Sequence, residues 1–84
     1  MEQFETGMMA RSKSGHDAGK VYVITKVEEA YVYLVDGKVR TLDKPKKKKK
    51  KHVQLIKESF YIQGATDVDI KRWIKIWNKE DNLN

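Results

Sequence analysis

KSGHDAGK at residues 13–20, followed directly by VYVITKV at residues 21–27, is the stretch of sequence that decides the fold. The first part is polar and contains two glycines, which is typical of a tight loop. The second part is rich in β-branched and aromatic residues, which is typical of a strand. Gly15 and Gly19 can adopt positive φ at little steric cost. We therefore expect a sharply turning loop that leads into a strand after Lys20.

This loop is also basic, because it contains Lys13 and Lys20 and follows Arg11. Positive side chains beside backbone N–H groups suit a phosphate group. Two interpretations stay open. The loop contacts nucleic acid, with Gly15 and Gly19 letting the backbone approach the phosphates, or it is an ordinary hairpin loop that is basic.

Strand patterns on both sides of this stretch predict a small β domain. A frayed lead-in is expected at residues 1–6 and a weak strand at residues 7–12. In the strand at residues 21–27 both faces carry apolar side chains, so we expect another element to cover part of its outside. Alternation predicts one face with Val21, Val23, Thr25 and Val27, and an opposite face with Tyr22, Ile24 and Lys26.

Three further strands are expected at residues 31–35, 38–42 and 52–56. Asp36-Gly37 predicts a type I′ hairpin turn, which needs positive φ at both central residues. Five short strands joined by tight turns favour a small barrel, because closing the sheet removes exposed edges.

Residues 46–51 are six consecutive lysines. Their mutual repulsion predicts an irregular loop over residues 44–51. Such a loop can be an idle, solvated segment, or it can bind phosphates as point charges without reading bases. We favour phosphate binding. Together with Pro45 the run also resembles a nuclear localisation signal.

The C-terminal part changes to a helical period. After a connector that begins at residue 58, we expect a helix over residues 67–79, with Thr66 and Asp69 forming a capping box. Its apolar residues have i, i+3, i+4, i+7 spacing and are Ile70, Trp73, Ile74 and Trp77. We expect this face to pack on the domain itself; a partner or dimer interface and a membrane surface are the alternatives.

The four tyrosines have no spacing that indicates a site. We expect ordinary packing beside the strands, and the functional alternatives are a stacking platform for unpaired bases or an aromatic cage for a methylated amine. These residues are Tyr22, Tyr31, Tyr33 and Tyr61.

Positive charge is concentrated in one part of the chain. The net charge is +6, yet residues 10–57 hold 14 Lys and Arg against 5 Asp and Glu. Such a distribution indicates a surface that binds a polyanion: RNA, DNA, anionic lipid or an acidic protein.

The segment from Met9 to Val35 resembles a KOW motif, with a strand, a polar loop, a glycine followed by a basic residue, and two more short strands. The pieces SGHDAGK (residues 14–20) and YLVDG (residues 33–37) are similar to KOW-type large-subunit ribosomal proteins of archaea and eukaryotes, the fourteen-e class and its relatives, and to small bacterial counterparts. The resemblance covers residues 7–56. It implies an SH3-like barrel that binds ribosomal or other structured RNA. The long C-terminal extension of the eukaryotic proteins has no counterpart here, so their place in the ribosome is not carried over.

The residues needed for catalysis are not arranged in any recognisable pattern. His16 and His52 are the only histidines, cysteine is absent, and no phosphate-loop or dinucleotide fingerprint occurs. We predict no enzyme activity, no cofactor and no metal site. Lack of an apolar run of about 20 residues, of a secretory signal and of cysteine leads us to expect a cytoplasmic protein without membrane association, monomeric when free.

Together these observations predict a mainly β fold: a KOW-type, SH3-like barrel of five strands over residues 7–57, with a C-terminal amphipathic helix in the same domain. The expected function is non-catalytic binding of RNA, ribosomal RNA above all, or action with the translation machinery. The alternatives are sequence-neutral binding of duplex DNA, and a protein-interaction module that docks on ribosome or RNA polymerase. The candidate RNA-binding residues are Arg11, Lys13, Ser14, Gly15, His16, Gly19, Lys20, Lys38, Arg40, Lys44, Lys46, Lys47, Lys48, Lys49, Lys50, Lys51 and His52.

Overall fold

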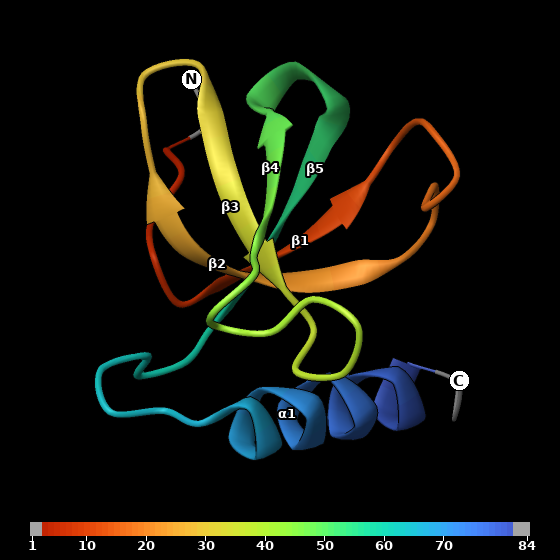
Figure 1. Cartoon of the computed structure of the whole chain (residues 1–84). Helices are drawn as coiled ribbons and strands as arrows, with labels where there is room; N and C mark the ends of the chain where they lie inside the picture. The colour runs from red at the N-terminus through yellow and green to blue at the C-terminus, as the bar shows by residue number, and fades with distance from the viewer. Residues whose placement is uncertain (1–2, 82–84) are drawn as a thin grey trace.

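A computed structural model describes residues 3–81 and shows five antiparallel strands in one sheet with a single C-terminal helix (Figure 1). The sheet order is β4-β3-β2-β1-β5. The elements are β1 (Met8–Ser12), β2 (Val21–Val27), β3 (Tyr31–Val35), β4 (Lys46–Lys49), the 3₁₀ turn η1 (Lys50–His52), β5 (Val53–Ser59) and α1 (Asp67–Asp81).

The predicted mainly β fold with a C-terminal helix is therefore confirmed. The edge strands β4 and β5 follow each other in the chain through η1, and the sheet curves strongly between them, as expected of an SH3-like domain (Figure 1). Within residues 3–81 these two edges do not pair with each other, so hydrogen bonds do not close the sheet into a complete barrel.

The sheet buries apolar side chains on both faces. The inner cluster consists of Ala10, Tyr22, Ile24, Val32, Leu34 and Val53. The outer cluster consists of Met9, Val23, Val35 and Ile70, and α1 covers it with Trp73, Ile74 and Trp77 (Figure 1). The prediction that another element covers the outside of β2 is confirmed, and the tryptophan face of the helix packs on its own sheet. Phe60 stacks on Trp73 with ring centroids 4.7 Å apart.

A β-bulge in β2 changes the predicted faces. Ile24 pairs with Leu34 but Lys26 pairs with Tyr33, so Thr25 is the extra residue on its strand. Because side chains alternate along a strand, one extra residue moves all later side chains to the other face. Val27 therefore packs against the inner cluster, and Lys26 lies 5.2 Å from the Tyr33 ring centroid on the outer face. The faces predicted for these two residues were wrong.

The predicted return strand at residues 38–42 was also wrong, because residues 36–45 form a loop. Asp36 holds this loop: its Oδ1 accepts the backbone N–H groups of residues 38, 39 and 40 at 2.9, 3.0 and 2.8 Å. Gly37 has φ 78°, but Asp36 does not have positive φ, so the turn is not type I′. A Cβ on Gly37 would collide with the carbonyl oxygen of Asp67, so glycine lets this loop pack against the start of α1.

The lysine run provides the fourth strand instead of an irregular loop. Residues 46–49 form β4, which pairs antiparallel with β3. Mutual repulsion is reduced because alternate lysines point to opposite faces and acidic side chains lie on each face.

The remaining boundaries differ by a few residues. Phe4 packs against the inner cluster, so the lead-in is not frayed there; Met1 and Glu2 lie outside the described residues. β5 continues to Ser59, whereas His52 belongs to η1.

The helix begins as predicted and runs two residues further, to Asp81. The capping box is confirmed, because Thr66 Oγ1 accepts the Asp69 N–H at 3.2 Å and Asp69 Oδ2 accepts the Thr66 N–H at 3.0 Å. Over residues 3–81, no helix has the length and apolar character needed to cross a bilayer.

Candidate nucleic-acid interface

Asp17 is the organising residue of the 13–20 loop. Its side chain is 7% exposed and accepts hydrogen bonds from Ser12 Oγ at 2.9 Å and Tyr22 OH at 3.1 Å. It also forms ion pairs with Lys46 Nζ at 2.9 Å and Lys48 Nζ at 3.0 Å. Lys48 Nζ donates a second hydrogen bond to the Ser14 carbonyl at 2.9 Å. One buried carboxylate thus fastens the loop to β2 and β4.

These contacts lower the pKa of Asp17 and raise the pKa of Tyr22. Burial by itself raises the pKa of Asp17, but the hydrogen bonds from Lys46, Lys48, Ser12 and Tyr22 outweigh it and hold this pKa well below its usual range. Burial and the adjacent carboxylate raise the pKa of Tyr22 to about 12. At neutral pH the cluster is a buried anion held by two cations and two hydroxyl groups.

The lysine run is divided by strand alternation. Lys46 and Lys48 point to the Asp17 side, with side chains 26% and 10% exposed. Lys47 points to the other side, is 50% exposed, and lies 3.8 Å from Glu28 Oε1. Lys47 lies opposite Tyr33 on β3, and Lys49 lies opposite Tyr31. Residues directly opposite each other in a ladder share a face, so both lysines belong to the outer face with these tyrosines. Two of the six lysines predicted to bind phosphate are therefore occupied in holding the fold.

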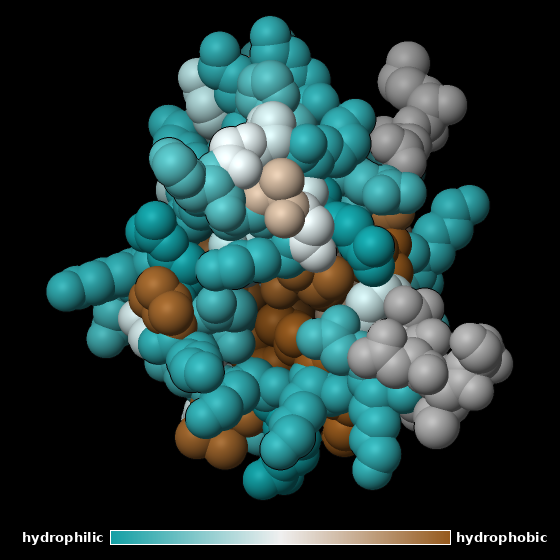
Figure 2. Space-filling model, turned by 90° about the vertical axis from the view of Figure 1, so that its right-hand side faces the viewer, coloured by the Kyte–Doolittle hydropathy of each residue, from teal (hydrophilic) through white to brown (hydrophobic). Residues whose placement is uncertain are grey.

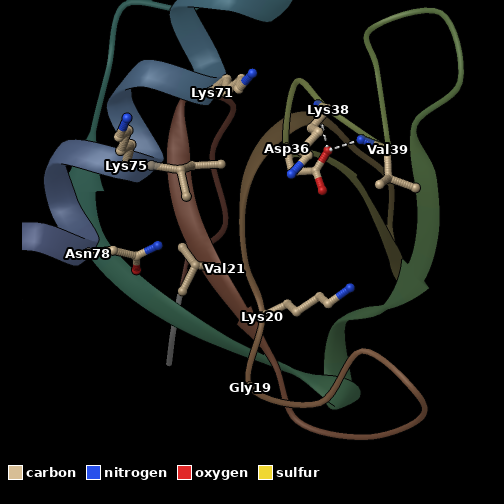
Figure 3. Close-up of a pocket in the computed structure, with 10 residues that line it drawn as sticks. Gly19, Lys20, Val21, Asp36, Lys38, Val39, Lys71, Lys75 and Asn78 are labelled. Atoms are coloured by element: carbon tan, nitrogen blue, oxygen red, sulfur yellow. Dashed lines mark hydrogen bonds between the residues drawn. The ribbon is translucent and has the colours of Figure 1, made fainter.

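A basic groove lies where three separate segments meet (Figure 3). The end of the 13–20 loop, the 36–40 loop and α1 border a groove of about 510 Å³, with Val21, Val39 and Ile74 as the apolar lining. Figure 2 shows this side of the molecule, where a hydrophobic recess is bordered by hydrophilic side chains. The groove carries the exposed side chains of Lys20, Lys38, Lys71 and Lys75.

Its one carboxylate does not cancel this charge. Among the described residues that line the groove, Asp36 is a single carboxylate against four lysines, and its Oδ1 accepts three backbone N–H groups of its own loop. In Figure 3, Lys20 extends from the loop exit toward the Asp36–Val39 turn. A smaller depression of about 190 Å³ shares Lys20, Asp36 and Val39 with the groove and adds His16, Asp17, Tyr22, Arg40 and Lys46. The two hollows form one basic surface.

The other predicted site residues are not part of this surface. Arg11 lies over the Trp77 ring at 5.5 Å, and Lys50 lies 5.5 Å from the Phe4 ring centroid. The backbone N–H of Lys13 bonds the His52 carbonyl at 2.8 Å. Ser14 accepts from Lys48 through its carbonyl group, whereas Lys44 and Lys51 are exposed elsewhere.

The two loop glycines have the predicted positive φ, 87° at Gly15 and 90° at Gly19. However, the Gly19 N–H donates to the Ser12 carbonyl at 2.8 Å, so this amide holds the loop closed and is not directed at a phosphate. Gly19 therefore allows the positive φ that closes the loop, and its N–H group does not contribute to the basic surface.

Three residues that contribute to the site, Asp17, Lys71 and Lys75, were missed from the sequence. Asp17 was not singled out, although an acidic residue between two glycines in a basic loop is a signal for an internal ion pair. Lys71 and Lys75 were assigned only to the polar side of the helix, and no local signal shows that this side meets the 36–40 loop. Lys47 and Lys49 were among the predicted site residues, but their outward orientation depends on the register of β4, which a run of identical residues does not reveal.

Among residues 3–81, no group of three or more His, Cys, Asp and Glu side chains is placed to hold a metal ion. A scan against protein-family models gave no match, and a search of curated proteins found no significant relative. The interpretation of this surface therefore depends on its own geometry and charge.

Proposed function

We propose that this protein is a non-catalytic RNA-binding protein whose basic groove holds the phosphate backbone. The observation that carries the proposal is the convergence of Lys20, Lys38, Lys71 and Lys75 from three segments onto one groove. Exposed lysines bind phosphates as point charges, and among the described residues no ion pair engages the groove lysines as Asp17 engages Lys46 and Lys48.

Ribosomal RNA, or an RNA of the translation machinery, is the proposed target because residues 7–56 resemble KOW-type ribosomal proteins. The protein-docking alternative has less support, because Trp73 and Trp77 pack against the outer cluster. The duplex-DNA alternative uses the same phosphate contacts and is separated from RNA by measurement with both nucleic acids.

The test is a salt series of binding curves for the full chain with a labelled single-stranded RNA. Four groove lysines on four phosphates contribute about −3 to the slope of log K against log salt, from ~0.7 per phosphate. The Lys38→Ser/Lys75→Ser variant should reduce the slope by about 1.4 on the same basis.

The matched control is Lys57→Ser/Arg72→Ser, which also removes two exposed positive charges but none from the groove. It should leave the slope within about 0.3 of the wild-type value if contacts, and not net charge, decide the slope. Equal losses in the two variants would show that the groove is not the contact surface. A wild-type protein that binds RNA without salt dependence would contradict the proposal altogether.

A further inference from the structure

The helix covers only part of the outer face of the sheet. On β3 the outward side chains are Tyr31, Tyr33 and Val35; Val35 lies in the cluster under α1, whereas the two tyrosines are half-buried beyond it. Their neighbours across the ladders are lysines: Lys26 on β2, and Lys47 and Lys49 on β4. We call these five residues the tyrosine–lysine face.

Lysine ammonium groups already lie close to the aromatic rings of this face. Lys47 Nζ lies 4.4 Å from the Tyr31 ring centroid and 5.9 Å from that of Tyr33, and Lys26 Nζ lies 5.2 Å from the Tyr33 centroid. These lysines are on long, exposed side chains, so they can turn from the rings to a phosphate. The rings would then be free to take a planar group.

There is room for such a group next to Tyr31. A hollow of about 500 Å³ is lined by Tyr31, by Lys49, Lys50 and Lys51, and by Glu29 and Ala30. An aromatic wall with three lysines around it matches the chemistry of an unpaired nucleotide, since the ring can stack on the base and the ammonium groups can meet the phosphates.

The acidic side chains near this face repel a polyanion, so binding requires that positive charge exceed negative charge there. Glu28 lies 3.8 Å from both Lys26 and Lys47, and Tyr33 OH donates to it at 3.3 Å. Glu29 lines the hollow. With three lysines against Glu28 on the face, and three against Glu29 around the hollow, positive charge still exceeds negative charge in both places.

We infer that the tyrosine–lysine face binds unpaired bases of single-stranded RNA by stacking on Tyr31 and Tyr33. This inference rests on the proposed RNA-binding function and specifies its target: an RNA with an accessible single-stranded segment. The groove supplies phosphate contacts that do not depend on strandedness, and the tyrosine–lysine face adds the preference for unpaired bases.

The experiment compares two variants of the full chain on two probes. Tyr31→Leu/Tyr33→Leu removes the rings, whereas Tyr31→Phe/Tyr33→Phe keeps them and loses the same hydroxyl groups. The probes are a labelled oligouridylate and a fully paired RNA hairpin with the same number of phosphates. Thermal melting of each variant is recorded in the same buffer.

Stacking contributes about 5- to 150-fold in affinity for each base. The leucine variant should therefore bind oligouridylate at least about 10-fold more weakly and bind the hairpin within about twofold of wild type. The phenylalanine variant should stay within about threefold of wild type on both probes. Because stacking is not ionic, the salt slope should not change.

Three results would overturn the inference. Leucine and phenylalanine variants that bind oligouridylate equally well would show that the rings do not stack on bases. A leucine variant that loses both probes equally would show no preference for unpaired bases. In either case the groove proposal stands if Lys38→Ser/Lys75→Ser still weakens binding. Wild-type protein that binds neither probe would overturn both proposals.

A second measurement needs no variant and so does not depend on the folding of one. Oligouridylate carrying photoreactive 4-thiouridine is irradiated with the wild-type protein, and the adducts are located by mass spectrometry. We expect adducts at Tyr31 or Tyr33. Adducts found only at other residues would contradict the inference.

Discussion

Replacing Lys48 by methionine should destabilise the fold, whereas the same change at its neighbour Lys47 should be nearly neutral. Lys48 is 10% exposed and donates to Asp17 and to the Ser14 carbonyl group. Lys47 is 50% exposed and has an ion pair with Glu28 at 3.8 Å. Methionine keeps most of the aliphatic stem in both places, so the comparison isolates the ammonium group.

The size of the effect follows from burial. A hydrogen bond to a charged group contributes ~1.5–3 kcal/mol, and removing one partner of a buried ion pair costs ~3–5 kcal/mol. Asp17 keeps Lys46 in the Lys48→Met variant, so we expect a loss of about 2 kcal/mol in the free energy of unfolding. The exposed pair of Lys47 contributes at most ~1 kcal/mol. In a domain of this size a loss of 2 kcal/mol lowers the Tm by roughly 8–16 °C.

The assay is urea unfolding followed by circular dichroism, with midpoint and slope fitted for each variant. A double-mutant cycle with Asp17→Asn measures the coupling, which should be favourable and close to the loss in Lys48→Met alone. Equal midpoints for Lys47→Met and Lys48→Met would refute the division of the run into inward and outward lysines. It would instead support a disordered lysine segment.

Four other tests address separate parts of the structure. Trp73→Ala should lose about 3 kcal/mol on urea unfolding, because Trp73 is half-buried and stacked on Phe60; a nearly unchanged midpoint would mean that the helix does not pack on the sheet. Gly37→Ala should lower the Tm more than Gly19→Ala, because both have positive φ but only Gly37 lacks room for a Cβ; the reverse order would contradict the packing of the 36–40 loop on α1. Since folding lowers the pKa of Asp17 from 3.8, the stability that it contributes is complete at neutral pH and is lost as pH falls below about 4; the stability difference between wild type and Asp17→Asn should therefore shrink in acid. Since folding raises the pKa of Tyr22 from 10.0 to about 12, its contribution is lost as pH rises through that range, and Tyr22→Phe should lessen the alkaline loss of stability.

Local signals predicted the elements that depend on neighbouring residues. The capping box at Thr66 and the spacing of Ile70, Trp73, Ile74 and Trp77 predicted both the start of α1 and the face that packs. The β-branched and aromatic runs predicted β2 and β3 with their bounds. Positive φ at Gly15 and Gly19 was predicted as well.

The errors come from interactions between residues far apart in the chain. Repulsion within residues 46–51 predicts disorder, but pairing with β3 and the ion pairs to Asp17 and Glu28 favour a strand. Asp-Gly predicts a hairpin, yet Asp36 instead bonds three backbone N–H groups and the chain goes on to contact α1. Binding surfaces are hardest to predict because their residues come from several segments.

The sequence by itself determined the mainly β class, the amphipathic helix, the turning points at glycine and the concentration of positive charge before residue 58. These properties depend on backbone preference and side-chain period, which act over a few neighbouring residues. Only the tertiary structure decided which lysines point to the Asp17 side and which point to the opposite face. It did so because one buried carboxylate, Asp17, attracts Lys46 and Lys48 to its side of the sheet, while strand alternation turns Lys47 and Lys49 to the other. The groove likewise exists only because the 36–40 loop packs against α1 and brings Lys38 close to Lys71 and Lys75.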